Sequence, residues 1–255
     1  MQDPSRLLPA IVDLALAAGR VILPLYDAHA APTTKADGTP VTEADTAAEG
    51  LILAGLADLT PDVPAVAEEM MAAGARPATG RTFWLVDPLD GTKEFVARTG
   101  EFTVNIGLVV DGTPVLGVIH APVTGETYAA AGGRATWAAA GAVPAPIRAR
   151  PRPTSDVVAT VSRRHGAGGP TARFMAENGV TGRLSVGSSL KFGLIARGLA
   201  DIYPRFGETS EWDTAAGHAI LAAAGGRVDG LDGRPLAYGK PGFRNAGFVA
   251  WGAPS

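Results

Sequence analysis

The chain has 255 residues, of which 46% are hydrophobic and 18% are charged, and its net charge at pH 7 is −3. This composition excludes a wholly disordered chain, and the charge gives no electrostatic footprint for nucleic acid or for an anionic membrane. Because the chain has no cysteine, disulfide bonds and thiolate metal sites are excluded as well.

The first predicted element is a helix, because the apolar residues between Leu7 and Leu25 recur at steps of three and four. Asp3 stands where a signal peptide has a basic region, and Asp13 and Arg20 interrupt the apolar run. We therefore expect a packed helix rather than a signal peptide. No segment supplies the ~20 apolar residues that a membrane span needs.

A second helix is predicted from its N-cap Thr42 to about Leu59. The next elements are extended. They are a short apolar stretch at 63–67, a buried strand at 82–86 that stops at Asp87, and a hairpin formed by 102–110 and 114–120 around Asp111-Gly112.

The segment 138–156 is rich in Ala, Pro and Arg without a clear period, which is typical of a boundary. We therefore expect two halves: residues 1–140, an α+β half that binds metal, and residues 141–255, an α/β half. In the second half, strands are predicted at 157–162, 183–186 and 200–205. Helices are predicted at 169–178, after Gly187-Ser188-Ser189, and from about Asp213 to Gly225-Gly226.

The run DPLDGT follows the strand that ends at Asp87. Pro88 restricts the backbone, so the carboxylates of Asp87 and Asp90 can face one point and hold hard cations, which prefer oxygen ligands. If a helix starts at Gly91-Thr92, its free N–H groups form an anion site beside these cations. The alternative is an Asp-Pro turn followed by an Asp or Thr helix cap.

Two more acidic positions can complete such a site. Glu68-Glu69 alone is typical of a solvated pair, but it ends an apolar stretch nineteen residues before Asp87. If both strands lie side by side in one sheet, Glu68 joins Asp87 on a metal. Asp213 precedes the last predicted helix, where it is an N-cap, a metal ligand, or both.

Several motifs in one order extend over nearly the whole chain: VTEAD from Val41, Glu68-Glu69, WLVDPLDGTKEF from Trp84, EFTVNIGLV from Glu101, GSSLK from Gly187, YPRFG from Tyr203 and WDTAAG from Trp212. This set resembles the lithium-sensitive, Mg²⁺-dependent phosphatase superfamily of inositol monophosphatase and fructose-1,6-bisphosphatase, and within it the CysQ type of 3′(2′),5′-bisphosphate nucleotidase. One departure is Ala67, where CysQ-like proteins usually carry Ser. The resemblance implies a layered αβαβα sandwich and cytoplasmic location, with a peripheral place at the inner membrane as the alternative.

The resemblance also implies a set of metal ligands: Glu68, Asp87 and the backbone carbonyl of Leu89 for one Mg²⁺, Asp87, Asp90 and Asp213 for a second, and Glu68 for a third, looser ion. Thr92, supported by Asp45, would orient the attacking water, with Glu68 as the third catalytic residue. Water would displace the ester in line, without a phospho-enzyme, and Li⁺ would inhibit.

The uncleaved phosphate of a bisphosphorylated nucleotide needs cationic partners, and Lys191 and Arg205 are the matching residues. The alternatives are a solvated helix position for Lys191 and a surface ion pair for Arg205. His165 either borders the adenosine or is merely exposed. The resemblance implies these substrate contacts: Glu68, Leu89, Asp90, Gly91, Thr92, Ser188, Lys191, Arg205 and Asp213.

The expected reaction is removal of the 3′-phosphate from 3′-phosphoadenosine 5′-phosphate, and from its 5′-phosphosulfate analogue, by a monomer or homodimer. One rival is a phosphatase of inositol 1-phosphate or fructose 1,6-bisphosphate, or an enzyme that accepts several of these esters. A phosphatase with an Asp nucleophile is a weaker rival, because its D-x-D-x-T pattern spaces the carboxylates differently. From another class, the chain is a catalytically silent nucleotide sensor.

Overall fold

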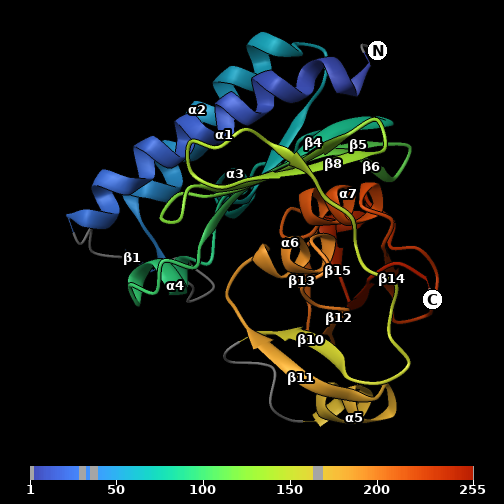
Figure 1. Ribbon diagram of the computed structural model, residues 1–255. Coiled ribbons are helices and arrows are strands. Elements are labelled where there is room, and N and C mark those ends of the chain that lie inside the picture. Colours follow the sequence, from blue (N-terminus) through green and yellow to red (C-terminus); the bar gives the residue numbers. More distant parts are fainter. Residues whose placement is uncertain (1–2, 29–32, 35–39, 163–168, 255) are drawn as a thin grey trace.

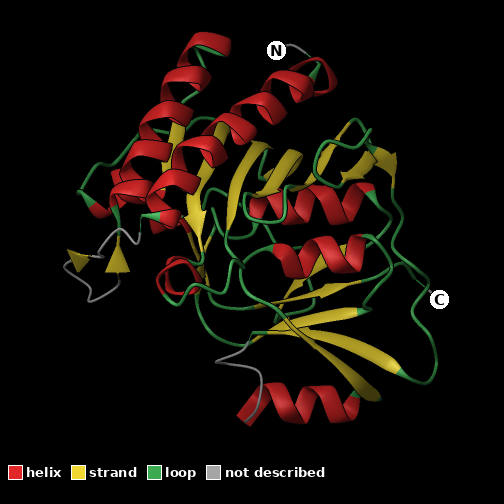
Figure 2. Ribbon diagram, turned by 60° about the vertical axis from the view of Figure 1, so that its left-hand side comes forward, coloured by secondary structure: helices red, strands yellow, loops and turns green. Residues whose placement is uncertain are grey.

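The computed structural model of the protein describes residues 3–28, 33–34, 40–162 and 169–254. Within these residues, two outer helices, a seven-stranded sheet, two inner helices, a five-stranded sheet and a last helix follow one another as layers. Figures 1 and 2 show the layers from two sides. The αβαβα sandwich expected from the sequence is confirmed.

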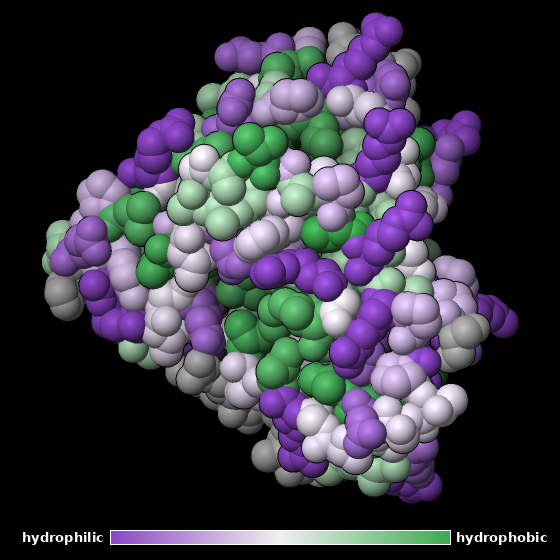
Figure 3. Space-filling model, viewed as in Figure 1, coloured by the Kyte–Doolittle hydropathy of each residue, from purple (hydrophilic) through white to green (hydrophobic). Residues whose placement is uncertain are grey.

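The outer helices are α1 (Pro4–Asp27) and α2 (Glu43–Leu59), which lie side by side on one face of the seven-stranded sheet (Figure 1). Among the described helices, α1 is long and apolar enough to cross a membrane by length and composition. Its apolar face, however, packs against α2 and the sheet, as the face of a core helix does. On the side shown in Figure 3, hydrophilic side chains are spread among the apolar ones over these helices.

The seven-stranded sheet runs in chain order through β3 (Ala65–Ala67), β4 (Thr82–Asp90), β5 (Thr103–Val110), β6 (Thr113–Ala121), β7 (Glu126–Ala131), β8 (Arg134–Ala138) and β9 (Ala145–Pro146). β3 is parallel to β4, and the other neighbours are antiparallel. The β5–β6 hairpin was predicted. The strand expected to stop at Asp87 continues to Asp90, because both residues pair with β5 across a register shift.

The five-stranded sheet has the order β11 (Val180–Ser185), β10 (Val157–Val161), β12 (Ile202–Arg205), β16 (Phe248–Trp251) and β14 (Arg227–Gly230). The inner helices α6 (Leu190–Ala196) and α7 (Ala215–Ala223) separate the two sheets, and α5 (Gly169–Glu177) covers the outer face. β7, β8, β14 and β16 were not predicted from the sequence. The division of the chain near residue 140 stays a prediction.

The remaining elements are short: β1 (Thr33–Thr34), β2 (Pro40–Val41), α3 (Glu68–Ala72), α4 (Thr92–Val96), β13 (Thr209–Ser210), a 3₁₀ turn η1 (Pro241–Phe243) and β15 (Arg244–Asn245). β1 pairs with β2, and β13 pairs with β15. Two of these elements, α3 and α4, directly follow β3 and β4, so they lie at the same end of the seven-stranded sheet.

Two glycines allow α7 to lie very close to the seven-stranded sheet. Gly107 on β5 and Gly117 on β6 are directly opposite each other. A Cβ atom on Gly117 would lie 2.3 Å from the carbonyl oxygen of Ala216, and one on Gly107 would lie 3.0 Å from the Cβ atom of Ala215. This close approach carries Asp213, just before α7, toward the ends of β3 and β4.

We expect the substitution Gly117→Ala to lower the free energy of unfolding by about 1–3 kcal/mol, because overpacking forces the backbone of α7 away from the sheet. Urea denaturation measures the change. Gly50→Ala is the matched control, since nothing lies within 4 Å of its added Cβ atom in the exposed face of α2. This control is expected to gain about 0.5–1 kcal/mol from helix propensity. Equal midpoints for both variants would contradict the close approach.

Candidate active site

The acidic residues at the ends of β3 and β4 come together as the sequence predicted. Because Ala67 pairs with Val86 in parallel register, the next residues along the two chains, Glu68 and Asp87, lie side by side, although Asp87 still belongs to β4. Carboxylate oxygens of Glu68, Asp87 and Asp213 lie within 4.8 Å of one another. Asp87 is 1% exposed, so its charge is almost completely removed from water.

Asp213 reaches this point from a turn rather than from a helix cap. Its Oδ2 accepts a hydrogen bond of 2.9 Å from the backbone N–H of Ser210. The N-cap of α7 is Thr214, and the helix begins at Ala215. The reading of Asp213 as an N-cap is therefore wrong, because this carboxylate closes the turn before the helix.

Asp90 is oriented by residues from two other elements. Its Oδ2 accepts hydrogen bonds from the backbone N–H of Ser189 at 2.6 Å and from Nδ2 of Asn105 at 3.3 Å. Asn105 in turn accepts a bond of 2.7 Å from Oγ of Ser189. Sequence reasoning did not single out Asn105 or Ser189. The available signal was a lone amide inside an apolar strand, since a buried polar side chain needs partners.

The electrostatics of the cluster favour a bound cation. Burial first, and then the charges of Glu68, Asp90 and Asp213, raise the pKa of Asp87 well above its usual value. Burial and the charges of Asp90 and Glu68 likewise raise the pKa of Asp213. Burial raises the pKa of Asp90 to about 6, although Lys191 partly offsets this effect. Closely spaced carboxylate oxygens withdrawn from water fit a hard divalent cation, which relieves their repulsion.

These raised pKa values predict that stabilisation by Mg²⁺ depends on pH. At a pH above the ordinary pKa values of the unfolded chain, the clustered carboxylates destabilise the metal-free protein. At a pH below their raised pKa values in the folded protein, they hold protons that Mg²⁺ must displace. We expect the rise in Tm caused by Mg²⁺ to be larger at pH 8 than at pH 5, on either side of the pKa of about 6 of Asp90. Thermal unfolding with and without Mg²⁺ measures this; equal shifts would contradict the cluster as its binding place.

Thr92 and Asp45 are hydrogen-bonded to each other beside this cluster. Oγ1 of Thr92 donates to Oδ1 of Asp45 at 3.3 Å, and the carbonyl oxygen of Leu89 lies 3.4 Å from it. The other oxygen of Asp45 accepts bonds of 2.7 Å from the N–H and hydroxyl of Thr42, which is the predicted N-cap of α2. Thr92 is the first residue of α4 and not its cap, because Gly91, at φ 98°, holds the cap position.

A pocket opens beside the carboxylates. It is lined by residues from both sheets, from α4 and α6 and from the segments next to them: Asp90, Gly91, Lys93, Glu94, Ser162, Gly187, Ser188, Ser189, Lys191, Phe192, Tyr203, Arg205, Thr209, Asp213, Thr214 and Phe248. The lining includes Ser188, Lys191 and Arg205, the residues predicted to face a second phosphate. His165 lies outside the described residues.

Lys191 is buried in the wall of this pocket. It is 5% exposed, so the reading of a solvated helix position is wrong. Its Nζ donates to the carbonyl oxygens of Ser188 at 2.5 Å and of Val186 at 3.2 Å. Burial lowers its pKa to about 8, while Asp90 raises it and Arg205 lowers it further. Ser188 has a φ of +49°, unusual for a residue with a side chain, and its carbonyl is held by this ammonium.

Arg205 ends β12 in the same pocket wall. Its Nε is buried, and within the described part of the chain it has no hydrogen-bond partner. Within those residues Arg205 forms no ion pair either, so they offer no partner for the surface ion pair that was the alternative prediction. A buried guanidinium N–H without a partner costs free energy, so it is suited to an anionic ligand that enters from the pocket.

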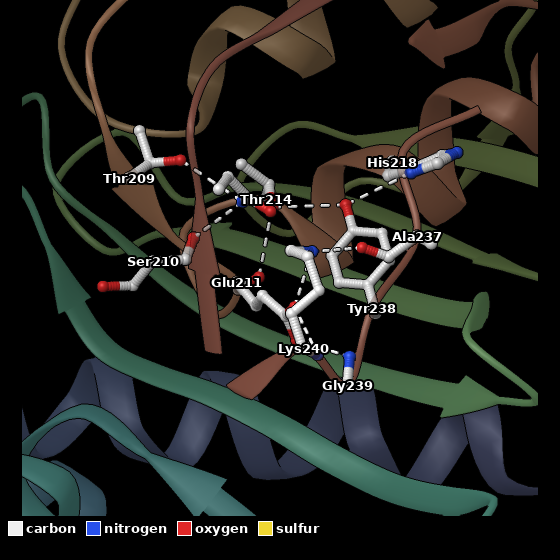
Figure 4. A network of polar contacts seen from close by, with 10 residues as sticks. Thr209, Ser210, Glu211, Thr214, His218, Ala237, Tyr238, Gly239 and Lys240 are labelled. Atoms are coloured by element: carbon white, nitrogen blue, oxygen red, sulfur yellow. Dashed lines mark hydrogen bonds and ion pairs between the residues drawn. The ribbon is translucent and has the colours of Figure 1, made fainter. Parts of the chain in front are cut away.

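The turn that carries Asp213 is held by the loop 237–245 (Figure 4). The fully buried carboxylate of Glu211 accepts the backbone N–H groups of Gly239 at 2.7 Å and Lys240 at 3.0 Å. It also forms an ion pair of 2.6 Å with Nζ of Lys240. The backbone just before Asp213 is thereby tied to this loop.

The other side of Asp213 is tied to the same loop through Thr214. Its Oγ1 donates to the carbonyl oxygen of Glu211 at 3.2 Å and accepts bonds from Tyr238 at 3.2 Å and Asn245 at 3.1 Å. Figure 4 shows Glu211 and Tyr238 converging on Thr214. Sequence reasoning missed this network, because its hydrogen-bonded partners lie up to 31 residues apart and have no local pattern.

Comparison with known proteins agrees with this geometry. A family model described as the inositol monophosphatase family matches residues 3–251. The chain belongs to the inositol monophosphatase family. It is therefore a phosphatase of a metal-dependent family, and its acidic cluster is suited to hold the metal.

Relatives with sequence similarity are named 3′(2′),5′-bisphosphate nucleotidase CysQ. The protein from Escherichia coli O157:H7 is 46% identical over 246 residues, which cover 95% of this chain and 98% of that protein. The protein from Salmonella typhimurium is also 46% identical over 246 residues, with the same coverage of both chains. The crystal structure of CysQ from Bacteroides thetaiotaomicron has a TM-score of 0.79 and 37% identity, and covers 96% of this chain and 97% of that one.

Proposed function

We propose that the protein is a Mg²⁺-dependent 3′(2′),5′-bisphosphate nucleotidase that converts 3′-phosphoadenosine 5′-phosphate to AMP and phosphate. The observation that carries this proposal is the pair of cationic side chains in the pocket beside Asp90 and Asp213: Lys191, which is buried, and Arg205, whose Nε is buried without a partner within the described residues. The similarity to CysQ nucleotidases supports the same substrate. The 5′-phosphosulfate analogue is a second expected substrate.

The two cations favour an ester with a second anionic group. Two N–H groups of the Lys191 ammonium are engaged by carbonyl oxygens, which leaves one for a ligand, and Nε of Arg205 is free to donate. Inositol 1-phosphate has one phosphate, which would lie at the carboxylate cluster, so the Lys191 ammonium and Nε of Arg205 would stay without an anionic partner. The 5′-phosphate of the nucleotide supplies that partner.

The residues that would hold two or three Mg²⁺ ions are Glu68, Asp87, the carbonyl of Leu89, Asp90 and Asp213. When bound, such ions polarise phosphoryl oxygens, activate a water and stabilise the leaving alkoxide. Their oxygen-only donor set and the mutual repulsion of the carboxylates support Mg²⁺ as the metal.

The chain's own residues orient the water and the ester. Asp45 accepts a hydrogen bond from the Thr92 hydroxyl. A lone pair of Oγ1 is therefore left to accept a hydrogen bond from the attacking water, which orients that water. Thr42 keeps Asp45 in place through two hydrogen bonds. Lys191 and Arg205 bind the 5′-phosphate, which turns the 3′-phosphate toward the carboxylates. Positioning of this kind lowers the barrier without a phospho-enzyme.

The test is phosphate release from four esters: 3′-phosphoadenosine 5′-phosphate, its 5′-phosphosulfate analogue, inositol 1-phosphate and fructose 1,6-bisphosphate. Each is measured with and without Mg²⁺ and with added Li⁺. We expect the adenine nucleotides to have the highest kcat/KM, with turnover that needs Mg²⁺ and is inhibited by Li⁺. A higher kcat/KM for a sugar phosphate would overturn the assigned pocket, and tight nucleotide binding without turnover would indicate a sensor. We also propose that the protein lies in the cytoplasm and is a monomer or a homodimer.

A further inference from the structure

The first turn of α3, which begins with Glu68, is capped from a distant part of the chain. Its N-cap, Ala67, makes no side-chain cap hydrogen bond. Instead, Oε2 of Glu49 accepts the backbone N–H of Glu69 at 2.7 Å, and Oε1 of Glu49 accepts that of Met70 at 2.7 Å. Glu49 lies on α2 and is 6% exposed, so both its oxygens are engaged away from bulk water.

This cap decides where α3 starts. A five-residue helix does not form by itself, because the first turn is costly and few bonds follow it. The first N–H groups of a helix have no partner within the helix, and a carboxylate there also interacts favourably with the helix dipole. Glu49 therefore holds the backbone directly after Glu68, and with it the direction in which the carboxylate of Glu68 leaves the strand.

Glu49 also has a counterpart one turn earlier on the same helix. Asp45 and Glu49 are four residues apart and both buried, so they lie on one face of α2. Asp45 contacts the side chain of Thr92, while Glu49 contacts the backbone that follows Glu68. One helix face thus reaches two sides of the carboxylate cluster, through two separate sets of hydrogen bonds.

We propose that Glu49 is a positioning residue that sets Glu68 for metal binding, while Asp45 on the same face serves the water through Thr92. The proposal rests on the proposed role of Glu68 as a metal ligand, but not on the identity of the ester. The two buried carboxylates of α2 are therefore expected to have different effects when they are removed: loss of Glu49 weakens metal binding, whereas loss of Asp45 lowers turnover with metal bound.

The test is calorimetric titration of the full-length protein with Mn²⁺, in the absence of substrate, for wild type and Glu49→Gln. Glutamine keeps the shape but turns an amide nitrogen, a donor, toward one of the two N–H donors. We expect the Kd for Mn²⁺ to rise about 10-fold or more, the size of effect usual for residues that orient metal ligands. Glu43→Gln, which changes an exposed side chain in the first turn of α2, is the matched control and is expected to bind like wild type.

Two further measurements separate positioning from general loss of structure. The amide hydrogens of Glu69 and Met70 are expected to exchange slowly in the wild type and faster in Glu49→Gln. The metal-free Tm is expected to fall by only a few degrees, as for the loss of one helix cap. Asp45→Asn is expected to keep the Mn²⁺ affinity while kcat falls. Should Glu49→Gln not fold, Glu49→Asp, which keeps the charge on a shorter side chain, is titrated and expected to show weakened Mn²⁺ binding.

An Mn²⁺ affinity within twofold of wild type in the folded Glu49 variant overturns the proposal. So does a loss of affinity of the same size in Asp45→Asn, because the two carboxylates would then not act separately. Failure of the proposed nucleotide substrate would appear in the ester panel and would leave the Mn²⁺ titrations unchanged, so the two failures are distinguishable.

Discussion

Replacing Asp87 by asparagine is expected to lower kcat/KM by at least about 10³-fold, since a clamping metal supplies several kcal/mol of transition-state stabilisation. Asp87 is the most deeply buried of the clustered carboxylates, and its oxygen lies within 4.8 Å of those of Glu68 and Asp213. It is also the residue proposed to contact both firmly held ions. The decrease is expected in kcat as well as in kcat/KM, because the ions act mainly on the transition state.

The same substitution is expected to stabilise the metal-free protein. Burial and three neighbouring carboxylates raise the pKa of Asp87, so at pH 8 its ionised form destabilises the folded state. Asparagine removes the charge and keeps an oxygen for the backbone N–H of Leu89, which donates to Asp87 at 3.0 Å. We expect a higher Tm than wild type without Mg²⁺ and a much smaller rise on adding it.

The control is Asp58→Asn, which changes an exposed carboxylate on α2. It is expected to leave both the turnover and the Mg²⁺-induced shift in Tm as in wild type. A metal-free Asp87→Asn protein that is less stable than wild type would show that the carboxylate cluster is not repulsive. If Asp87→Asn keeps Mg²⁺-dependent turnover within tenfold of wild type, Asp87 is not a metal ligand.

The parts of the site that the sequence predicted depend on local pattern. Thr42 was predicted as the N-cap because Thr is a favoured cap residue and stands at the start of the helix. The structure confirms the cap and adds reciprocal bonds between Thr42 and Asp45. Glu68 and Asp87 were placed together because each ends an apolar stretch, and parallel register makes such ends meet. In both cases the deciding contacts are within a few residues or follow from the direction of neighbouring strands.

The parts that were missed depend on contacts between distant elements. The proximity of Asp213 to Asp87 was expected only from the resemblance to a family, because it requires α7 to lie on Gly107 and Gly117, and neither glycine shows by itself which helix will cover it. The cap from Glu49 to α3 and the ties of Glu211 to the loop 237–245 likewise join segments about 20 to 30 residues apart. The hydrophobic periodicity of the joined segments does not indicate such a hydrogen bond.

The missed strands have a different cause. β7 and β8 are rich in alanine, which favours helices by intrinsic propensity. Most of β7 is also buried on both faces, so apolar and polar residues do not alternate along it. Alternation is the main local signal for a strand. Its absence leaves only tertiary pairing to decide the conformation, and that information is not local.

Arg205→Met is expected to raise KM for 3′-phosphoadenosine 5′-phosphate about 10- to 100-fold, since a hydrogen bond to a charged group contributes roughly 1.5–3 kcal/mol. The substitution removes little from the folded protein, because Nε of Arg205 has no partner within the described residues. Because the lost contact is to the phosphate that is not cleaved, kcat is expected to change only a few-fold. Inositol 1-phosphate, which lacks a second phosphate, is expected to be hydrolysed as by wild type.

The pH dependence of kcat/KM provides an independent measure of the same pocket. The pKa of Lys191 is about 8, so in the wild type the ammonium loses its charge as the pH rises through 8, and kcat/KM for the nucleotide is expected to fall there. Burial is the main cause of this lowered pKa, and Arg205 contributes to it. Arg205→Met removes that contribution, so the fall is expected to move to higher pH, whereas Arg205→Lys keeps the charge and leaves it in place. Arg205 would not belong to the pocket for the second phosphate if KM were unchanged in Arg205→Met. The same would follow if kcat/KM fell at the same pH in both variants.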